Sequence, residues 1–213
     1  ADANETIAAW KTVLGITNRP AALALSRQNL PTFPRGTDAS TGEHWASADL
    51  TAKGAYNLLD TDGTPDVILF ATGSEVQLAV KARKLLAADD IHARVVSMPS
   101  REWFEQQDES YRDEVIPPGL RARVSVEAGI ALGWRDIVGD AGRTISLEHY
   151  GASADYATLY DKFGITAEAV AAAAKDSIAA AAAEPTAPFH ARPAGPVGPG
   201  DNVDAPHCST HPH

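Results

Sequence analysis

The sequence has little of several features that mark particular protein classes. It contains one cysteine, Cys208, in 213 residues, so no disulfide can form within the chain, which fits a reducing cytoplasm. No apolar run approaches the roughly 20 residues that cross a bilayer, and the N-terminus lacks a signal-peptide pattern. The formal net charge is −10, which argues against a nucleic-acid or anionic-membrane surface. We expect a cytoplasmic protein that binds neither nucleic acid nor membrane.

The length allows one good-sized domain, or one domain with part of another. Its hydrophobic content of 44% is ordinary for a globular protein. The chain opens without a methionine, directly on a helix-cap pattern at Asp2. These features predict a folded piece of a longer protein.

The stretch from Pro65 to Ser100 predicts a strand–helix–strand unit. Residues 67–71 (VILFA) form an unbroken apolar run, which is typical of a strand buried on both faces of a parallel sheet. Ser74 and Gln77 have the spacing of a capping box, which predicts a helix start at Ser74, and residues 93–98 predict the second strand. Such a unit folds as a right-handed parallel crossover.

Strands and helices are also expected before and after this unit. A helix is expected from Asp2 to Gly15, followed by a short buried strand at 21–26. The pattern at 53–59 predicts a strand that turns as a hairpin into the central unit, which would place one antiparallel strand at the sheet edge. Later strands are expected at 123–127 and 144–147, and later helices at 101–107, 111–115, 130–138, 155–163 and 166–183. We predict an α/β fold of three layers, with a mainly parallel sheet of about five strands and helices on both faces.

Several segments of the sequence resemble the C-terminal part of the transketolase family. They include ATGSEVQLAV, ARVVSMPS, SVEAGIALGW and LYDKFGITAEAV, and they run in order from residue 1 to about 175. ADANETIAAWK and AALALSRQNLP resemble the end of the family's pyrimidine-binding domain. The resemblance implies a remnant of that domain at 1–31, a linker at 32–50 and the C-terminal domain at 51–184. Residues 185–213, rich in proline and poor in aliphatic residues, predict a disordered tail.

The resemblance also implies a function for the protein to which this chain would belong. Transketolases transfer a two-carbon ketol group from a ketose phosphate to an aldose phosphate, as homodimers that use thiamine diphosphate and a divalent metal (Mg or Ca). In the family, the cofactor, the metal and the catalytic side chains lie in the first two domains, and none of those residues matches a residue here. We therefore expect no catalytic, cofactor-binding or metal-binding residue in this chain. It would supply structure, dimer contacts and one substrate contact, and would be inactive alone.

Arg27 is the candidate for that substrate contact. It leaves the expected strand at 21–26 at its C-terminal end, where open α/β sheets bind their ligands, and a guanidinium can bind phosphate oxygens in pairs. An arginine paired with a surface carboxylate is the alternative reading of the same position. Arg27 matches the arginine of the family's LSRQ motif, which contacts the phosphate of the bound sugar phosphate.

Other polar residues give weaker indications of a functional site. His44 stands alone in a loop, so we expect a surface residue rather than a ligand or base. Glu127 ends a strand without a partner His or second carboxylate nearby in sequence, so we expect it to be structural. The turn at Gly73 lacks the further glycines or the lysine of a nucleotide-binding loop. The tail carries metal-capable side chains without the paired spacing of a structural zinc site: His207, Cys208, His211 and His213. The alternative function is a free-standing α/β binding or regulatory module that docks to a partner chain.

Overall fold

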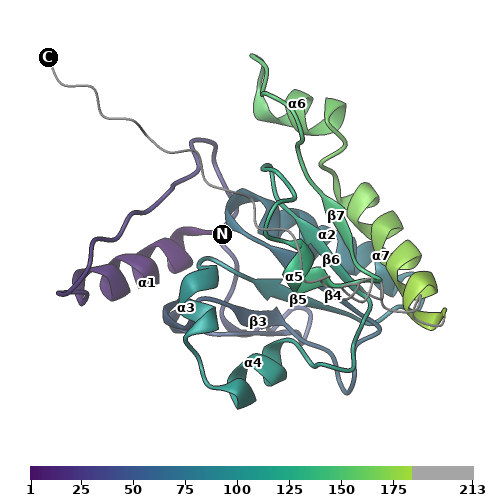
Figure 1. Cartoon of the computed structure of the whole chain (residues 1–213), viewed down its shortest axis with the longest axis horizontal. Coiled ribbons are helices and arrows are strands. Elements are labelled where there is room, and N and C mark those ends of the chain that lie inside the picture. Colours follow the sequence, from purple (N-terminus) through teal and green to yellow (C-terminus); the bar gives the residue numbers. More distant parts are fainter. Residues whose placement is uncertain (184–213) are drawn as a thin grey trace, which may run out of the picture.

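The computed structural model describes residues 1–183, which form a mixed sheet covered by helices (Figure 1). The expected tail, with its histidines and Cys208, lies outside the described residues. Within residues 1–183 the sheet has seven strands in the order β1-β2-β3-β5-β4-β6-β7. The strands are β1 (Gly36–Thr37), β2 (His44–Trp45), β3 (Tyr56–Leu59), β4 (Val67–Ala71), β5 (Ala93–Ser97), β6 (Arg123–Val126) and β7 (Arg143–Ile145).

The helices cover both faces of this sheet. They are α1 (Ala3–Leu14), α2 (Val76–Ala87), α3 (Arg101–Glu105), α4 (Glu109–Val115), α5 (Arg135–Val138), α6 (Tyr156–Lys162) and α7 (Ala167–Ala182), with 3-10 turns at Ala48–Lys53 and Gly73–Glu75. α2 and α7 contribute to one buried cluster, while α3, α4 and α5 contribute to the other. This arrangement confirms the predicted three-layer α/β fold. No helix in the described part of the chain is long and apolar enough to cross a membrane.

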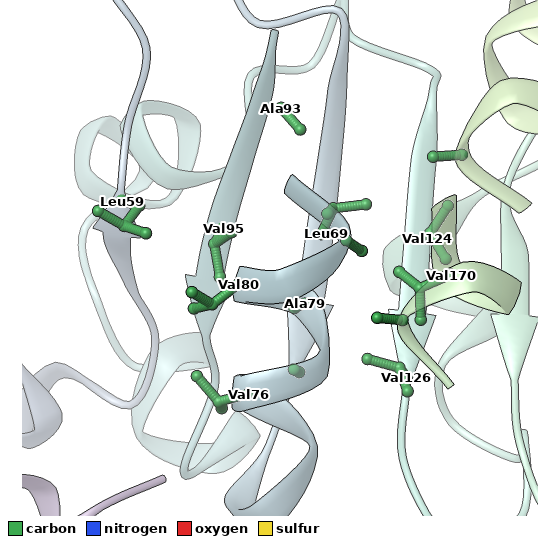
Figure 2. Packing of buried hydrophobic residues seen from close by; sticks show 14 of the residues in the cluster. Leu59, Leu69, Val76, Ala79, Val80, Ala93, Val95, Val124, Val126 and Val170 are labelled. Carbon is green, nitrogen blue, oxygen red and sulfur yellow. The ribbon is translucent and has the colours of Figure 1, made fainter. Parts of the chain in front are cut away.

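Strand β4 is the centre of the sheet and explains the apolar run VILFA. It pairs in parallel with β5 on one side and β6 on the other, and all five of its residues are buried. Alternate side chains of a strand point to opposite faces; accordingly Leu69 joins the cluster under α2 and α7, and Phe70 the cluster on the other face. Figure 2 shows Leu69 and Val124 lying opposite Val170 and the α2 side chains. Every position of β4 must therefore be apolar.

The predicted strand at 21–26 is wrong. The structure has no regular element there, and Leu25 is 61% exposed. A strand needs a neighbour to satisfy its backbone groups, and no strand of the described residues lies beside this segment. The apolar sequence of residues 21–26 predicted a buried strand. In the described part of the chain, no neighbouring strand buries this segment.

The predicted hairpin is also wrong, although its strand is antiparallel as expected. β3 pairs with β5 rather than with β4. Because β5 is buried along its whole length, it needs a neighbour on each side, and β3 fills the side away from β4. The expected linker at 32–50 contains β1 and β2, which extend the sheet beyond β3. The sheet therefore has seven strands rather than about five.

Two helix starts differ from the sequence-based expectation. At the end of β4 the chain first makes the 3-10 turn Gly73–Glu75, and α2 begins at Val76. The hydroxyl of Ser74 does not cap the helix, because it donates to the carboxylate of Glu75 at 2.6 Å. The helix expected at 130–138 is reduced to α5, because Gly133 before it adopts a positive φ of 93°.

Candidate functional site

A cavity of about 550 Å³ lies where the C-terminal ends of β4 and β5 approach α1. Its walls are α1, residues 20–25, and the loops that follow the two strands, including Gly73 and Ser100. This is the edge at which open α/β sheets bind ligands. In Figure 1, α1 lies to the left of the sheet, with its far end pointing away from it.

Arg27 follows the wall segment of this cavity and is exposed. Its guanidinium forms no ion pair with a carboxylate of residues 1–183, so the alternative of a surface ion pair is not what the structure shows. An exposed guanidinium keeps all five of its donors available to an anion. Arg27 therefore has the charge and the freedom to bind an anion at this edge.

Asp2, at the start of α1, holds the helix to the following segment. It is buried, and it caps the helix by accepting a hydrogen bond from the backbone N–H of Glu5 at 2.9 Å. The same carboxylate accepts from the backbone N–H of Phe33 and from Nη2 of Arg35, both at 2.9 Å. One carboxylate thus joins residues more than thirty positions apart.

Glu5, one turn into α1, reaches the sheet. Its carboxylate Oε1 accepts hydrogen bonds from the hydroxyl of Tyr56 on β3, at 2.7 Å, and from the hydroxyl of Ser97 at the end of β5. Burial, together with the Glu5 carboxylate, raises the pKa of Tyr56 above its usual value, so the phenol remains a donor. Sequence reasoning identified Asp2 and Glu5 only as a helix-start pattern and missed these contacts, because their partners are distant in sequence.

A third buried carboxylate, Glu75, lies at the turn before α2. Its Oε1 accepts hydrogen bonds from the Ser74 hydroxyl and from the Tyr160 hydroxyl of α6. Burial and the hydrogen bond to Glu75 raise the pKa of Tyr160 to about 12. The phenol therefore stays protonated near neutral pH and can donate to Glu75.

The remaining candidates from the sequence are Glu127 and His44. Oε2 of Glu127 accepts a hydrogen bond from the indole N–H of Trp134 at 2.7 Å, and both residues line a smaller cavity of about 240 Å³. His44 is exposed on β2, with Nδ1 3.4 Å from the hydroxyl of Thr37. Within residues 1–183 no group of three or more His, Cys, Asp or Glu side chains could hold a metal ion.

Known proteins resemble this chain in sequence. Residues 54–166, just over half of the chain, match the family described as the transketolase-like TK C-terminal domain. The transketolase of Mycobacterium tuberculosis is 54% identical over 185 residues, which are 84% of this chain and 25% of that protein. The transketolase of Geobacillus stearothermophilus is 45% identical over 171 residues, which are 80% of this chain and 25% of that protein.

Solved structures show the same relationship. Transketolase from Leishmania mexicana superposes with a TM-score of 0.73 at 36% identity, over 84% of this chain and 24% of that one. Transketolase from Pichia stipitis in complex with sedoheptulose 7-phosphate gives a TM-score of 0.73 at 37% identity, with the same coverage of both chains. The chain spans about a quarter of the length of these relatives. By its fold and by these matches, the chain belongs to the transketolase family and corresponds to the C-terminal part of its members.

Proposed function

We propose that this chain acts as the C-terminal section of a ketol transferase. The enzyme would transfer a two-carbon ketol group from a ketose phosphate to an aldose phosphate, as a homodimer. The observation that carries this proposal is the 54% identity to a transketolase over 84% of the chain. It is supported by the Pichia stipitis transketolases, which were solved in complex with sedoheptulose 7-phosphate and, as variants, with xylulose 5-phosphate and fructose 6-phosphate.

The cofactor and its metal would be held by the part of the enzyme that this chain does not span. Thiamine diphosphate, when bound there, would supply the electron sink of the reaction. The described residues assemble no metal-ligand group, and the buried carboxylates of Asp2, Glu5 and Glu75 are occupied by protein donors. Residues 1–31 would complete the pyrimidine-binding domain, with 32–50 as the connection and 51–184 as the C-terminal domain.

Arg27 would bind the phosphate of the sugar phosphate. Three features support this role: its exposed guanidinium, its place beside the cavity at the C-terminal ends of β4 and β5, and its position in the LSRQ word. The fork of guanidinium donors fits two phosphate oxygens at once, and such charge-assisted hydrogen bonds are stronger than neutral ones. The residue would select phosphorylated sugars without taking part in bond formation.

The test of this role is Arg27→Gln in the full-length enzyme that carries this chain as its C-terminal section. Loss of a charge-assisted contact of about 1.5–3 kcal/mol predicts a rise in KM for fructose 6-phosphate of about ten- to a hundredfold. With unphosphorylated fructose the KM is expected to stay unchanged. Steady-state kinetics with a short unphosphorylated aldose as acceptor would measure both values.

The matched control is Arg135→Gln, which removes an exposed arginine from α5. It is expected to leave both KM values unchanged. An equal loss with fructose 6-phosphate and with fructose in Arg27→Gln would show that Arg27 does not bind the phosphate.

A further inference from the structure

Large hydrophobic side chains are exposed along one edge of the sheet. β5, β4, β6 and β7 are parallel neighbours, so their C-terminal ends lie on the same edge, and the hydrogen bond between Glu5 and Ser97 holds α1 there. Exposed apolar side chains that gather in one region mark an interaction surface. Within residues 1–183, every exposed large hydrophobic side chain except Leu85 belongs to α1, to the segment after it, or to the chain that follows β6 or β7: Ile7, Trp10, Leu14, Leu25, Ile130, Leu132, Tyr150 and Tyr156.

The chain after β6 and the chain after β7 form one surface at this edge. The backbone N–H of Leu147 donates to the carbonyl O of Gly129 at 2.8 Å. The backbone N–H of Ala131 donates to Oε1 of Glu148, also at 2.8 Å. These hydrogen bonds connect the two loops, so their apolar side chains belong to one surface. Three of these side chains, which we call the edge patch, are more than half exposed: Ile130 (54%), Leu132 (84%) and Tyr150 (98%).

Two hollows connect the edge patch to α1. The cavity of about 240 Å³ is lined in part by Leu132. It shares Thr72, Ser100 and Glu102 with the cavity of about 550 Å³ beside α1. The two cavities therefore meet at the C-terminal ends of β4 and β5. The side chains that dominate binding at protein interfaces fill such pockets, so the protruding residues and the hollows together fit a protein partner.

The preceding part of the enzyme is the partner nearest to this surface. If the chain is the C-terminal section of a ketol transferase, about three quarters of the enzyme lies before Ala1, because the chain spans 25% of its relative. Glu5, close behind Ala1, bonds Ser97 at the end of β5, so that part joins the chain at this edge. A covalently attached partner has a high effective concentration at a neighbouring surface.

A second copy of the chain fits the edge patch less well. Glu102 and Glu127 line the cavity beside Leu132, and neither forms an ion pair with a Lys or Arg of residues 1–183. Two identical patches that met face to face would bring these carboxylates together, and like charges across an interface oppose association. The surface favours a partner that presents apolar side chains and hydrogen-bond donors.

We infer that the edge patch is a docking surface for the preceding part of the same enzyme. The inference rests on the proposed place of this chain at the end of a longer transferase, and it adds where the two parts meet. The loops after β6 and β7 would contact the preceding domains, besides the direct connection through α1. Leu132 and Tyr150 would be buried in that contact, and the C-terminal ends of the strands would face the rest of the enzyme.

The experiment is Leu132→Glu, made in the full-length enzyme and in this chain alone. In the full-length enzyme the new carboxylate would be buried without a partner, and we expect the Tm to fall by about 5 °C or more. In this chain alone the side chain stays in water, so the Tm should change by less than about 2 °C. Tyr150→Asp should behave in the same way. Scanning calorimetry would measure each Tm.

Leu85→Glu is the matched control. Leu85 is an exposed leucine near the end of α2, whereas the edge patch lies beyond the ends of β6 and β7. We expect Leu85→Glu to change the Tm of the full-length enzyme by less than about 2 °C. Sedimentation would give the association state of each variant, which should equal that of the unmodified enzyme.

The outcomes separate this inference from the proposed function. If Leu132→Glu lowers the Tm no more than Leu85→Glu, or lowers it equally in this chain alone, the docking role is overturned. Dissociation of the Leu132→Glu enzyme into monomers would overturn it too, because a second copy would then cover the patch. Ketol transfer by the unmodified enzyme is measured separately: an inactive enzyme with a destabilised Leu132→Glu variant would overturn the proposed function alone.

Discussion

Gly54→Ala is expected to cost more than about 4 kcal/mol of folding free energy, an exceptional loss for one methyl group. Gly54 has a φ of 86°, where an L-residue costs about 1–2 kcal/mol. An added Cβ would also overlap the backbone N of Phe104 and the carbonyl O of Ser100. These are backbone atoms, held by the hydrogen bond from the Ser100 N–H to the Gly54 carbonyl at 3.0 Å. Urea denaturation would measure the loss.

Gly63→Ala separates the strain from the overlap. Gly63 has a φ of 95° and no atom within 4 Å of an added Cβ, so only the backbone strain of about 1–3 kcal/mol applies. If both variants lost the same free energy, close packing of Gly54 against α3 would not be the cause.

Asp2→Ala is expected to release α1 while the sheet stays folded. The substitution removes the helix cap, which is worth about 1 kcal/mol. It also leaves the Arg35 guanidinium, whose side chain is 17% exposed, without its carboxylate, and breaking a buried pair costs roughly 3–5 kcal/mol. Little apolar burial compensates, because Ile7 and Leu14 are 68% and 76% exposed. Hydrogen exchange should show amides of residues 3–14 losing protection and those of β4 keeping it.

The control is Asp49→Ala, which removes the partner of Lys11 on the same helix. That pair is 3.5 Å apart and about three-quarters exposed at both side chains, so its removal should leave protection in α1 unchanged. If Asp2→Ala also left the protection of α1 unchanged, contacts other than those of the Asp2 carboxylate would hold the helix.

Local patterns were sufficient to predict the centre of the fold. The run VILFA is apolar at every position because β4 is covered by helices on both faces and by strands on both sides. The predicted strand–helix–strand unit is confirmed by β4, α2 and β5, which form a parallel pair with its crossover. The predicted α/β class and the family resemblance are confirmed by the sheet and by the comparisons.

Pairings between distant residues could not be predicted from local patterns. A turn signal after β3 indicates a change of direction but not the neighbour, and β3 pairs with β5 instead of β4. The segment at 21–26 is apolar enough for a strand, yet pairing needs a neighbour that the described residues do not supply. Hydrophobic pattern fixes which face a strand buries, whereas strand order depends on the whole set of strands.

The contacts around the candidate site show the same limit. Arg27 was identified from its position and its motif, and its role as a phosphate contact stays a prediction. The buried hydrogen bonds near the ends of β4 and β5 were not identified, because their partners are far apart in the sequence: Glu5 accepts from Ser97, and Glu75 accepts from Tyr160. No periodicity relates such pairs, since each depends on the packing of separate elements.

The most direct test of the account is a calorimetric titration of this chain with thiamine diphosphate and Mg²⁺, beside its circular-dichroism spectrum. We place cofactor and metal binding in the part of the enzyme that the chain does not span. We therefore expect a folded spectrum and no heat of binding. Saturable binding by the folded chain would contradict it, because residues that we assign to structure would then hold the cofactor.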